Sequence, residues 1–131
     1  MLNRKKKILL VEEEKFAALD ILSTLNELGY KVTSTVNNEK DAVRKYVFEK
    51  PDLVLIDIEL KRGAGSINTA KSILKKFKVP VVFLTVSPHE IFTKSTTMKS
   101  SFSFLTKPFN PLDLQAAIEM AFLNETFFIS N

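Results

Sequence analysis

The 131-residue sequence has no cysteine, a single histidine and no long apolar run. Without cysteine the chain can have neither a disulfide framework nor thiol chemistry, so a reducing cytoplasm is the expected compartment. No apolar segment approaches the ~18 residues that a membrane span needs. The basic start is followed by only four apolar residues before the acidic ones begin, which is too few for a signal peptide. The sequence therefore predicts a domain without a membrane partner.

Basic residues give the chain a formal net charge of +4. Part of this charge comes from Arg4 to Lys7, and part from the lysines between positions 71 and 78. A nucleic-acid footprint is one interpretation, and solvated helix faces with a solubilising N-terminus are the other. Because no helix-turn-helix or zinc-finger pattern accompanies the charge, we expect no direct nucleic-acid binding by this domain.

The apolar periodicity alternates between that of a strand and that of a helix along the whole chain. Strands are expected over residues 8–11, 31–36, 53–57, 81–86 and 102–106. Helices are expected over residues 15–28, 38–50, 67–77 and 88–99, and from 110 onward. This alternation predicts an α/β fold, a three-layer doubly wound (βα)5 domain with a five-stranded parallel sheet and flavodoxin-like topology. We expect one domain over residues 1–131, with a core from about 6 to 124 and a short tail over 125–131.

Capping residues support three of the expected helix boundaries. Gly29 stands where a left-handed residue would end the first helix. Asn38 is a suitable N-cap for the second helix, which Pro51 ends. Asn110 and Pro111 form an N-cap and N1 pair at the start of the last helix.

Polar side chains stand at the ends of four of the expected strands. They are Glu12 and Glu13 after the first strand, Asp57 in the third, Thr85 in the fourth and Lys107 after the fifth. Each alone has an ordinary explanation, such as a helix cap, an acidic first turn or a surface lysine. Because the carboxyl ends of parallel strands share one edge of the sheet, we expect the five side chains to converge there.

The chemistry of this set points to phosphoryl transfer. Carboxylates about 5 Å apart repel by roughly 3 kcal/mol per pair at an effective dielectric near 20, so the cluster favours a cation. Oxygen ligands suit Mg²⁺, and a metal with a lysine and a hydroxyl stabilises a phosphoryl group in transfer. Asp57 can itself accept that group as an aspartyl phosphate.

Four segments, "ILLVEEE", "PDLVLIDIEL", "VVFLT" and "FLTKPF", resemble in this order the motifs of the response-regulator receiver domain. The resemblance extends from about Lys6 to Leu123 and implies a chemotaxis-Y-like fold in a two-component regulatory system. It implies a cytoplasmic phosphoprotein that receives its phosphoryl group from a sensor histidine kinase or a phosphotransfer protein. Such a domain is not an enzyme toward other substrates, because it promotes only its own Mg²⁺-dependent phosphorylation and dephosphorylation.

The resemblance also assigns roles to individual residues. Asp57 would be the phosphoacceptor. The Mg²⁺ ligands would be Glu12, Glu13, Asp57 and the backbone carbonyl of Glu59.

Two further residues would respond to the phosphoryl group. Thr85 would donate a hydrogen bond to a phosphoryl oxygen, and Lys107 would pair with the phosphoryl charge. Phe104 falls on the family's switch aromatic, which moves inward when the threonine moves, although an ordinary core or edge aromatic is the alternative. The switching face would comprise the helix over 88–99, the strand over 102–106 and the last helix, and a homodimer through this face is a further expectation.

Three features depart from the family's pattern. Glu13 stands where an aspartate is usual, and its extra methylene moves the carboxylate by about 1.5 Å relative to a strict Mg²⁺ octahedron. "GAGSI" replaces a common loop sequence after the phosphoacceptor strand. Ser100 replaces a glycine that usually caps the fourth helix.

Other functions remain open at this point. A degenerate receiver would keep the fold as a phosphorylation-independent interaction module, and Glu13 is the observation that favours it. A nucleotide- or flavin-binding protein would need a phosphate loop after the first strand, where "VEEEKF" offers acids instead. A metal hydrolase is the third alternative, but His89, the only histidine, is expected at the surface.

Overall fold

The computed structural model describes residues 4–58, 72, 74–86 and 102–130. The strands are β1 (Lys7–Val11), β2 (Lys31–Val36), β3 (Leu53–Asp57), β4 (Val81–Thr85) and β5 (Phe102–Thr106). The helices are α1 (Lys15–Glu27), α2 (Glu39–Glu49) and α5 (Pro111–Ser130). Residues 72 and 74–76 are also helical, within the helix expected over 67–77. The rest of that helix and the helix expected over 88–99 lie outside the described residues.

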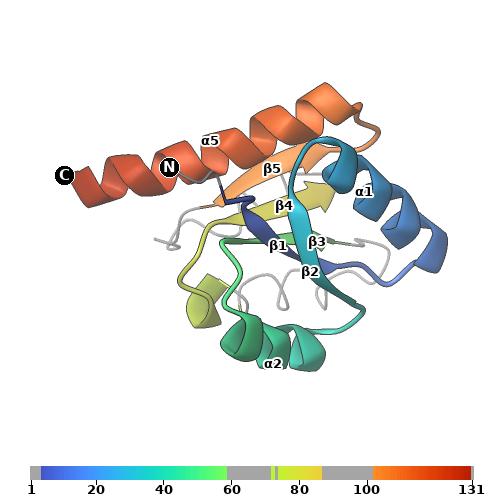
Figure 1. The fold of residues 1–131 in the computed structure, drawn as a ribbon, viewed down its shortest axis with the longest axis horizontal. Coiled ribbons are helices and arrows are strands. Elements are labelled where there is room, and N and C mark those ends of the chain that lie inside the picture. Colours follow the sequence, from blue (N-terminus) through green and yellow to red (C-terminus); the bar gives the residue numbers. More distant parts are fainter. Residues whose placement is uncertain (1–3, 59–71, 73, 87–101, 131) are drawn as a thin grey trace.

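The five strands form one parallel sheet in the order β2-β1-β3-β4-β5. Helices α1 and α5 cover one face of the sheet and α2 covers the other (Figure 1). The predicted doubly wound α/β architecture is therefore confirmed. This topology also brings the carboxyl ends of all five strands to one edge of the sheet, as the sequence predicted.

Side-chain alternation along the strands divides the core into two layers. Ile8 and Leu10 of β1 pack toward α1 and α5, whereas Leu9 and Val11 pack toward α2. The central strands are apolar on both faces because helices cover both faces. Consequently the site residues at the ends of β1, β3 and β4 extend from strands that are buried over most of their length.

The predicted helix caps are present. The Asn38 side chain accepts a hydrogen bond from the Asp41 N–H at 2.8 Å, and the Asn110 side chain accepts one from the Asp113 N–H at 2.8 Å. Gly29 has a φ of 95°, the left-handed conformation expected for it. The residue after α2, Lys50, also has a positive φ of 49°, which the sequence did not indicate.

Two boundaries differ from the sequence-based expectation. Strand β4 ends at Thr85, so Val86, predicted as its last residue, lies outside it and is exposed. Helix α5 continues to Ser130, so residues 125–130, predicted as a tail, extend the last helix. Among the described residues, none of the helices combines the length and the apolar character that crossing a membrane requires.

Candidate functional site

The pairing of the strands brings four of the predicted residues to one edge. Asp57, the last residue of β3, is in register with Leu84, and Thr85 follows as the last residue of β4. The Lys107 N–H, just after β5, donates to the Thr85 carbonyl at 2.9 Å. Glu12 follows the β1 residue Val11 directly.

An ion pair joins the two central side chains of this edge. The Lys107 Nζ donates to Asp57 Oδ2 at 2.6 Å. The Asp57 side chain is only 6% exposed and the Lys107 side chain is 28% exposed. The lysine therefore compensates a buried carboxylate at the place where the sequence predicted a phosphoryl partner.

Glu12 is the second buried acid of the site, with 6% of its surface exposed. Its Oε2 accepts a hydrogen bond from the Glu14 N–H at 2.8 Å, which fixes the carboxyl group at the start of α1. Burial, together with the neighbouring Asp57 carboxylate, raises the pKa of Glu12 to about 8. The Glu14 N–H and the charge of Lys107 oppose this rise only in part. Without a bound cation, Glu12 therefore binds a proton more readily than an ordinary glutamate does.

Two oxygens of this acidic pair are suited to a bound cation. Glu12 Oε1 and Asp57 Oδ1 are both buried without a hydrogen-bond partner. Neither carboxylate can donate to the other unless one is protonated, so the pair requires either a proton or a cation between them. Mg²⁺ commonly binds one or two carboxylates and keeps several waters, which fits these two acids.

Thr85 and Phe104 lie on the same face of neighbouring strands. Thr85 pairs in register with Thr106, and Phe104 pairs with Phe83, so the two predicted switch residues are diagonal neighbours. Thr85 is fully buried. Phe104 is only partly buried, and its ring centroid lies 5.6 Å from that of Phe83 and 5.4 Å from that of Phe102.

Glu13 and Glu59 complete the predicted metal ligands. Glu13 is described and exposed, in contrast to the buried Glu12. Glu59 lies outside the described residues, as do His89, Ser100 and the "GAGSI" segment. Within the part of the chain that the structure describes, no group of three or more acidic, histidine or cysteine residues is arranged to hold a metal ion. The described acidic centre therefore consists of the Glu12–Asp57 pair.

Glu14 has a supporting role that the sequence interpretation did not separate from those of its neighbours. Its side chain caps α1 by accepting hydrogen bonds from the Ala17 N–H at 2.7 Å and the Phe16 N–H at 3.2 Å. Its own N–H holds Glu12. The signal in the sequence is an acidic residue directly before the first helical residue. Its side-chain oxygens can accept hydrogen bonds from the N–H groups of the first helical turn.

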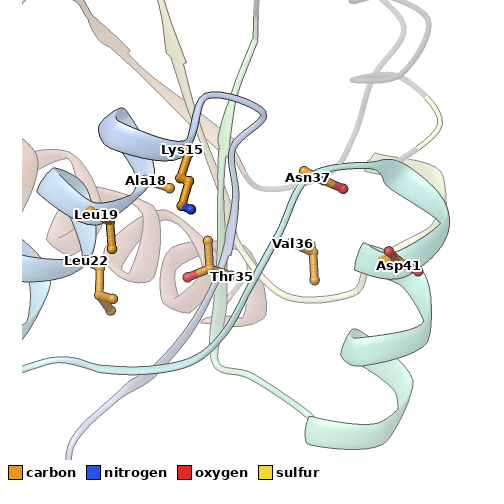
Figure 2. A pocket seen from close by; sticks show the side chains of 8 residues that line it. All are labelled: Lys15, Ala18, Leu19, Leu22, Thr35, Val36, Asn37 and Asp41. Carbon is orange, nitrogen blue, oxygen red and sulfur yellow. The ribbon is translucent and has the colours of Figure 1, made fainter.

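A cavity of about 510 Å³ lies between α1, β2 and the start of α2 (Figure 2). Its lining residues are Lys15, Ala18, Leu19, Leu22, Thr35, Val36, Asn37 and Asp41. None of the predicted site residues lines this cavity, so it is separate from the acidic centre.

Comparisons with known proteins agree with this arrangement. The family model described as "Response regulator receiver domain" matches residues 8–119. The transcriptional regulatory protein PdtaR of Mycobacterium tuberculosis is 31% identical over 116 residues, covering 88% of this chain and 56% of PdtaR.

Two solved structures show the same fold. The anti-anti-sigma factor PhyR of Bartonella quintana has 30% identity and a TM-score of 0.78, covering 98% of this chain and 51% of PhyR. The receiver domain of a modulated diguanylate cyclase from Desulfovibrio desulfuricans G20 has 29% identity and a TM-score of 0.78, covering 95% of this chain and 98% of that domain. The chain thus spans about half the length of PdtaR and PhyR. Because the family model covers most of the sequence and the sheet edge carries the matching residues, the chain belongs to the response-regulator receiver family of two-component systems.

Proposed function

We propose that this domain accepts a phosphoryl group on Asp57 from a sensor histidine kinase or a phosphotransfer protein. The observation that carries the proposal is the buried Asp57 carboxylate, held at 2.6 Å by Lys107 next to the buried acid Glu12. In the reaction an Asp57 oxygen forms a new P–O bond while the P–N bond of the donor phosphohistidine breaks.

The neighbouring side chains support this transfer in distinct ways. Lys107 is close enough to follow the negative charge as it moves from Asp57 to the phosphoryl oxygens. Thr85, at the end of the adjacent strand, supplies a hydroxyl for one of those oxygens. Glu12 and Asp57 would hold Mg²⁺, which when bound neutralises phosphoryl charge during transfer.

Phosphorylation would be read out on the face that contains Phe104. The phosphoryl group adds nearly two negative charges at the edge of the sheet. Movement of Thr85 toward that group would open space on the face that it shares with Phe104. We therefore expect β5 and the start of α5 to change on phosphorylation, and a homodimer through this face remains part of the proposal.

Intact-protein mass spectrometry after incubation with acetyl phosphate and Mg²⁺ tests the proposal. One phosphoryl group should be added to the wild type, and none in the presence of a chelator or in Asp57→Asn. Asp20→Asn, which removes an exposed acid from α1, is the matched control and should be phosphorylated normally. Equal phosphorylation of the two variants would contradict the assignment.

The alternative is a receiver that acts without phosphorylation. Glu13, longer than the usual aspartate and exposed, is the observation that favours it. A wild type that takes up no phosphoryl group under these conditions, while still binding a partner, would favour this alternative.

A further inference from the structure

Cations collect at the edge of the sheet opposite to the acidic site. Lys7 and Lys31 begin β1 and β2 as a register pair. Lys50 lies between α2 and β3, and Lys78 lies shortly before β4. The exposed members of this basic edge are Arg4, Lys5, Lys6, Lys31, Lys50 and Lys78. The longest basic run in the sequence supplies three of these six residues, and the fold adds Lys31, Lys50 and Lys78 to them.

Hydrogen bonds connect the segments that carry these cations. The Lys31 N–H donates to the Lys6 carbonyl at 2.9 Å. Tyr46 connects the segments of Lys50 and Lys78. Its carbonyl accepts a hydrogen bond from the Lys50 N–H at 3.0 Å, and its hydroxyl accepts one from the Lys78 N–H at 2.9 Å. Since neighbouring strands are about 4.8 Å apart, the basic edge is a row that follows the sheet from β2 to β4.

The acids near this row are mostly engaged with other groups. Asp52 Oδ2 accepts from the Lys7 N–H at 2.7 Å, and Glu49 Oε2 accepts from the Ser34 hydroxyl at 2.6 Å. Glu27 is exposed at the end of α1. Among the described residues, no exposed cation of the basic edge forms an ion pair. The Lys6 ammonium lies over the Phe122 ring, 5.2 Å from its centroid, so the charges available to an external anion are chiefly those of the other members.

An exposed aromatic side chain is close in sequence to one of these lysines. Phe48, in the last turn of α2 and two residues before Lys50, is 83% exposed, and its neighbour Val47 is 65% exposed. A line of cations follows a phosphate backbone, and an exposed ring offers a surface on which an unpaired base can stack. A lipid surface would instead be matched by a broad basic plane, so the linear arrangement favours a nucleic acid strand.

We propose that the basic edge and Phe48 bind single-stranded nucleic acid without sequence preference. The phosphates contact the lysines and a base stacks on the ring. The sequence-based expectation, in contrast, was that the domain does not bind nucleic acid directly and that its charge is solvated. The proposed site is separated from Asp57 by the length of the strands, roughly 16 Å for five residues, so binding does not depend on the proposed phosphorylation.

Fluorescence anisotropy with a short labelled oligonucleotide of mixed sequence, as RNA and as DNA, tests the proposal. The edge variant is Lys31→Gln with Lys50→Gln. The control variant is Lys15→Gln with Lys40→Gln, which removes the same charge from exposed positions at the starts of α1 and α2. Urea unfolding of each variant verifies that it is folded, and Lys5→Gln with Lys31→Gln is a second edge variant that avoids the left-handed position 50.

The edge variants should lose about tenfold in affinity, and the slope of log K against log salt should decrease by about 1.4 between roughly 50 and 200 mM. The control should change less than about threefold. Phe48→Ala should lose about tenfold while the salt slope stays the same, because stacking releases no counterions. The oligonucleotide that the wild type binds more tightly, RNA or DNA, identifies the type of strand that the edge recognises.

Three results would overturn the proposal. They are no binding of either oligonucleotide by the wild type at about 50 mM salt, equal losses in edge and control variants, and binding to phosphatidylserine vesicles but not to oligonucleotides. The last result would identify the edge as a membrane-binding surface. The Asp57→Asn variant should bind as the wild type does, which separates this outcome from that of the phosphorylation test.

Discussion

At the level of single residues, the two buried carboxyl groups of the site, Asp57 and Glu12, differ in how their negative charge is compensated. Asp57 has Lys107 at 2.6 Å, whereas Glu12 has a backbone N–H on one oxygen and an unsatisfied buried oxygen on the other. Removing charge from Glu12 by protonation satisfies the pair in the absence of metal, and a cation would do so when Mg²⁺ is bound. The stability of the domain should therefore report the state of this site.

The first prediction concerns pH in metal-free solution. Burial and Asp57 raise the pKa of Glu12 from its ordinary value of 4.5 to about 8, so in this window the folded state holds a proton that the unfolded state has lost. The free energy of unfolding should fall as pH rises from about 4.5 to about 8 and then level off. Urea unfolding with a chelator present measures this slope. Glu12→Gln should flatten it and Glu27→Gln, at an exposed position, should not; an unchanged slope in Glu12→Gln would contradict the assignment.

The second prediction concerns the length of the acid at position 13. If Glu13 contributes to the Mg²⁺ site, shortening it to aspartate should allow a better octahedral fit and tighten binding by roughly 1 kcal/mol. Calorimetric titration of Glu13→Asp against the wild type measures the difference. Glu27→Asp shortens an exposed acid at the other end of α1 and should leave Mg²⁺ affinity unchanged. Equal Mg²⁺ affinities of Glu13→Asp and the wild type would show that the length of the side chain at position 13 does not limit Mg²⁺ binding.

Among the secondary-structure elements, the helix ends show where backbone strain is stored. Gly29 adopts its positive φ without steric cost, and nothing within 4 Å would meet a Cβ there. Lys50 adopts a similar left-handed conformation with a side chain that disfavours it. The strain at position 50 is a consequence of turning the chain from α2 into Pro51 and β3.

The third prediction follows from that strain. Lys50→Gly should stabilise the domain by about 0.5–1 kcal/mol, because glycine accepts the left-handed conformation freely. The same substitution inside α2, Lys45→Gly, should destabilise by about 1 kcal/mol through loss of helix propensity. Urea unfolding distinguishes the two signs, and destabilisation by Lys50→Gly would mean that its side-chain contacts outweigh the backbone strain.

The fourth prediction concerns coupling between β4 and β5. Beryllofluoride, which mimics the phosphoryl group, should change hydrogen exchange most across residues 102–110, where Phe104 shares a face with Thr85. Thr85→Ala should reduce that change while leaving Asp57 able to accept a phosphoryl group. Thr106→Ala, in register with Thr85 but exposed, is the control and should retain the change. If hydrogen exchange instead changed most in α1 or α2, the output surface would lie on those helices and not on β5.

For the whole molecule, the sequence was sufficient to predict the order of elements and the convergence of the site. Buried strands such as 53–57 have an apolar pattern that only a sheet covered on both faces explains. The polar residue at the end of each strand then identified Asp57, Thr85 and Lys107, because parallel pairing leaves only one edge on which they can meet.

Other features depend on tertiary structure and could not be derived from sequence patterns. The burial of Glu12 against Asp57, and so its raised pKa, depends on packing between β1 and β3. The continuation of α5 to Ser130 was missed because residues 125–130 lack the regular spacing of the first turns. Only part of the basic edge, Arg4 to Lys6 and Lys78, stood out in the sequence, because Lys31 and Lys50 are distant from these residues and join them only through the parallel topology.

The central claim is that Asp57 is the phosphoacceptor, and the most direct test is to locate the phosphoryl group chemically. Borohydride reduces an aspartyl phosphate to homoserine, which remains through digestion and is located by peptide mass mapping. After treatment with acetyl phosphate and Mg²⁺, the account predicts homoserine at position 57, little of it when Lys107→Gln removes the pairing cation, and none when Mg²⁺ is chelated. Homoserine at another acid, or none at position 57 in the phosphorylated wild type, would contradict it.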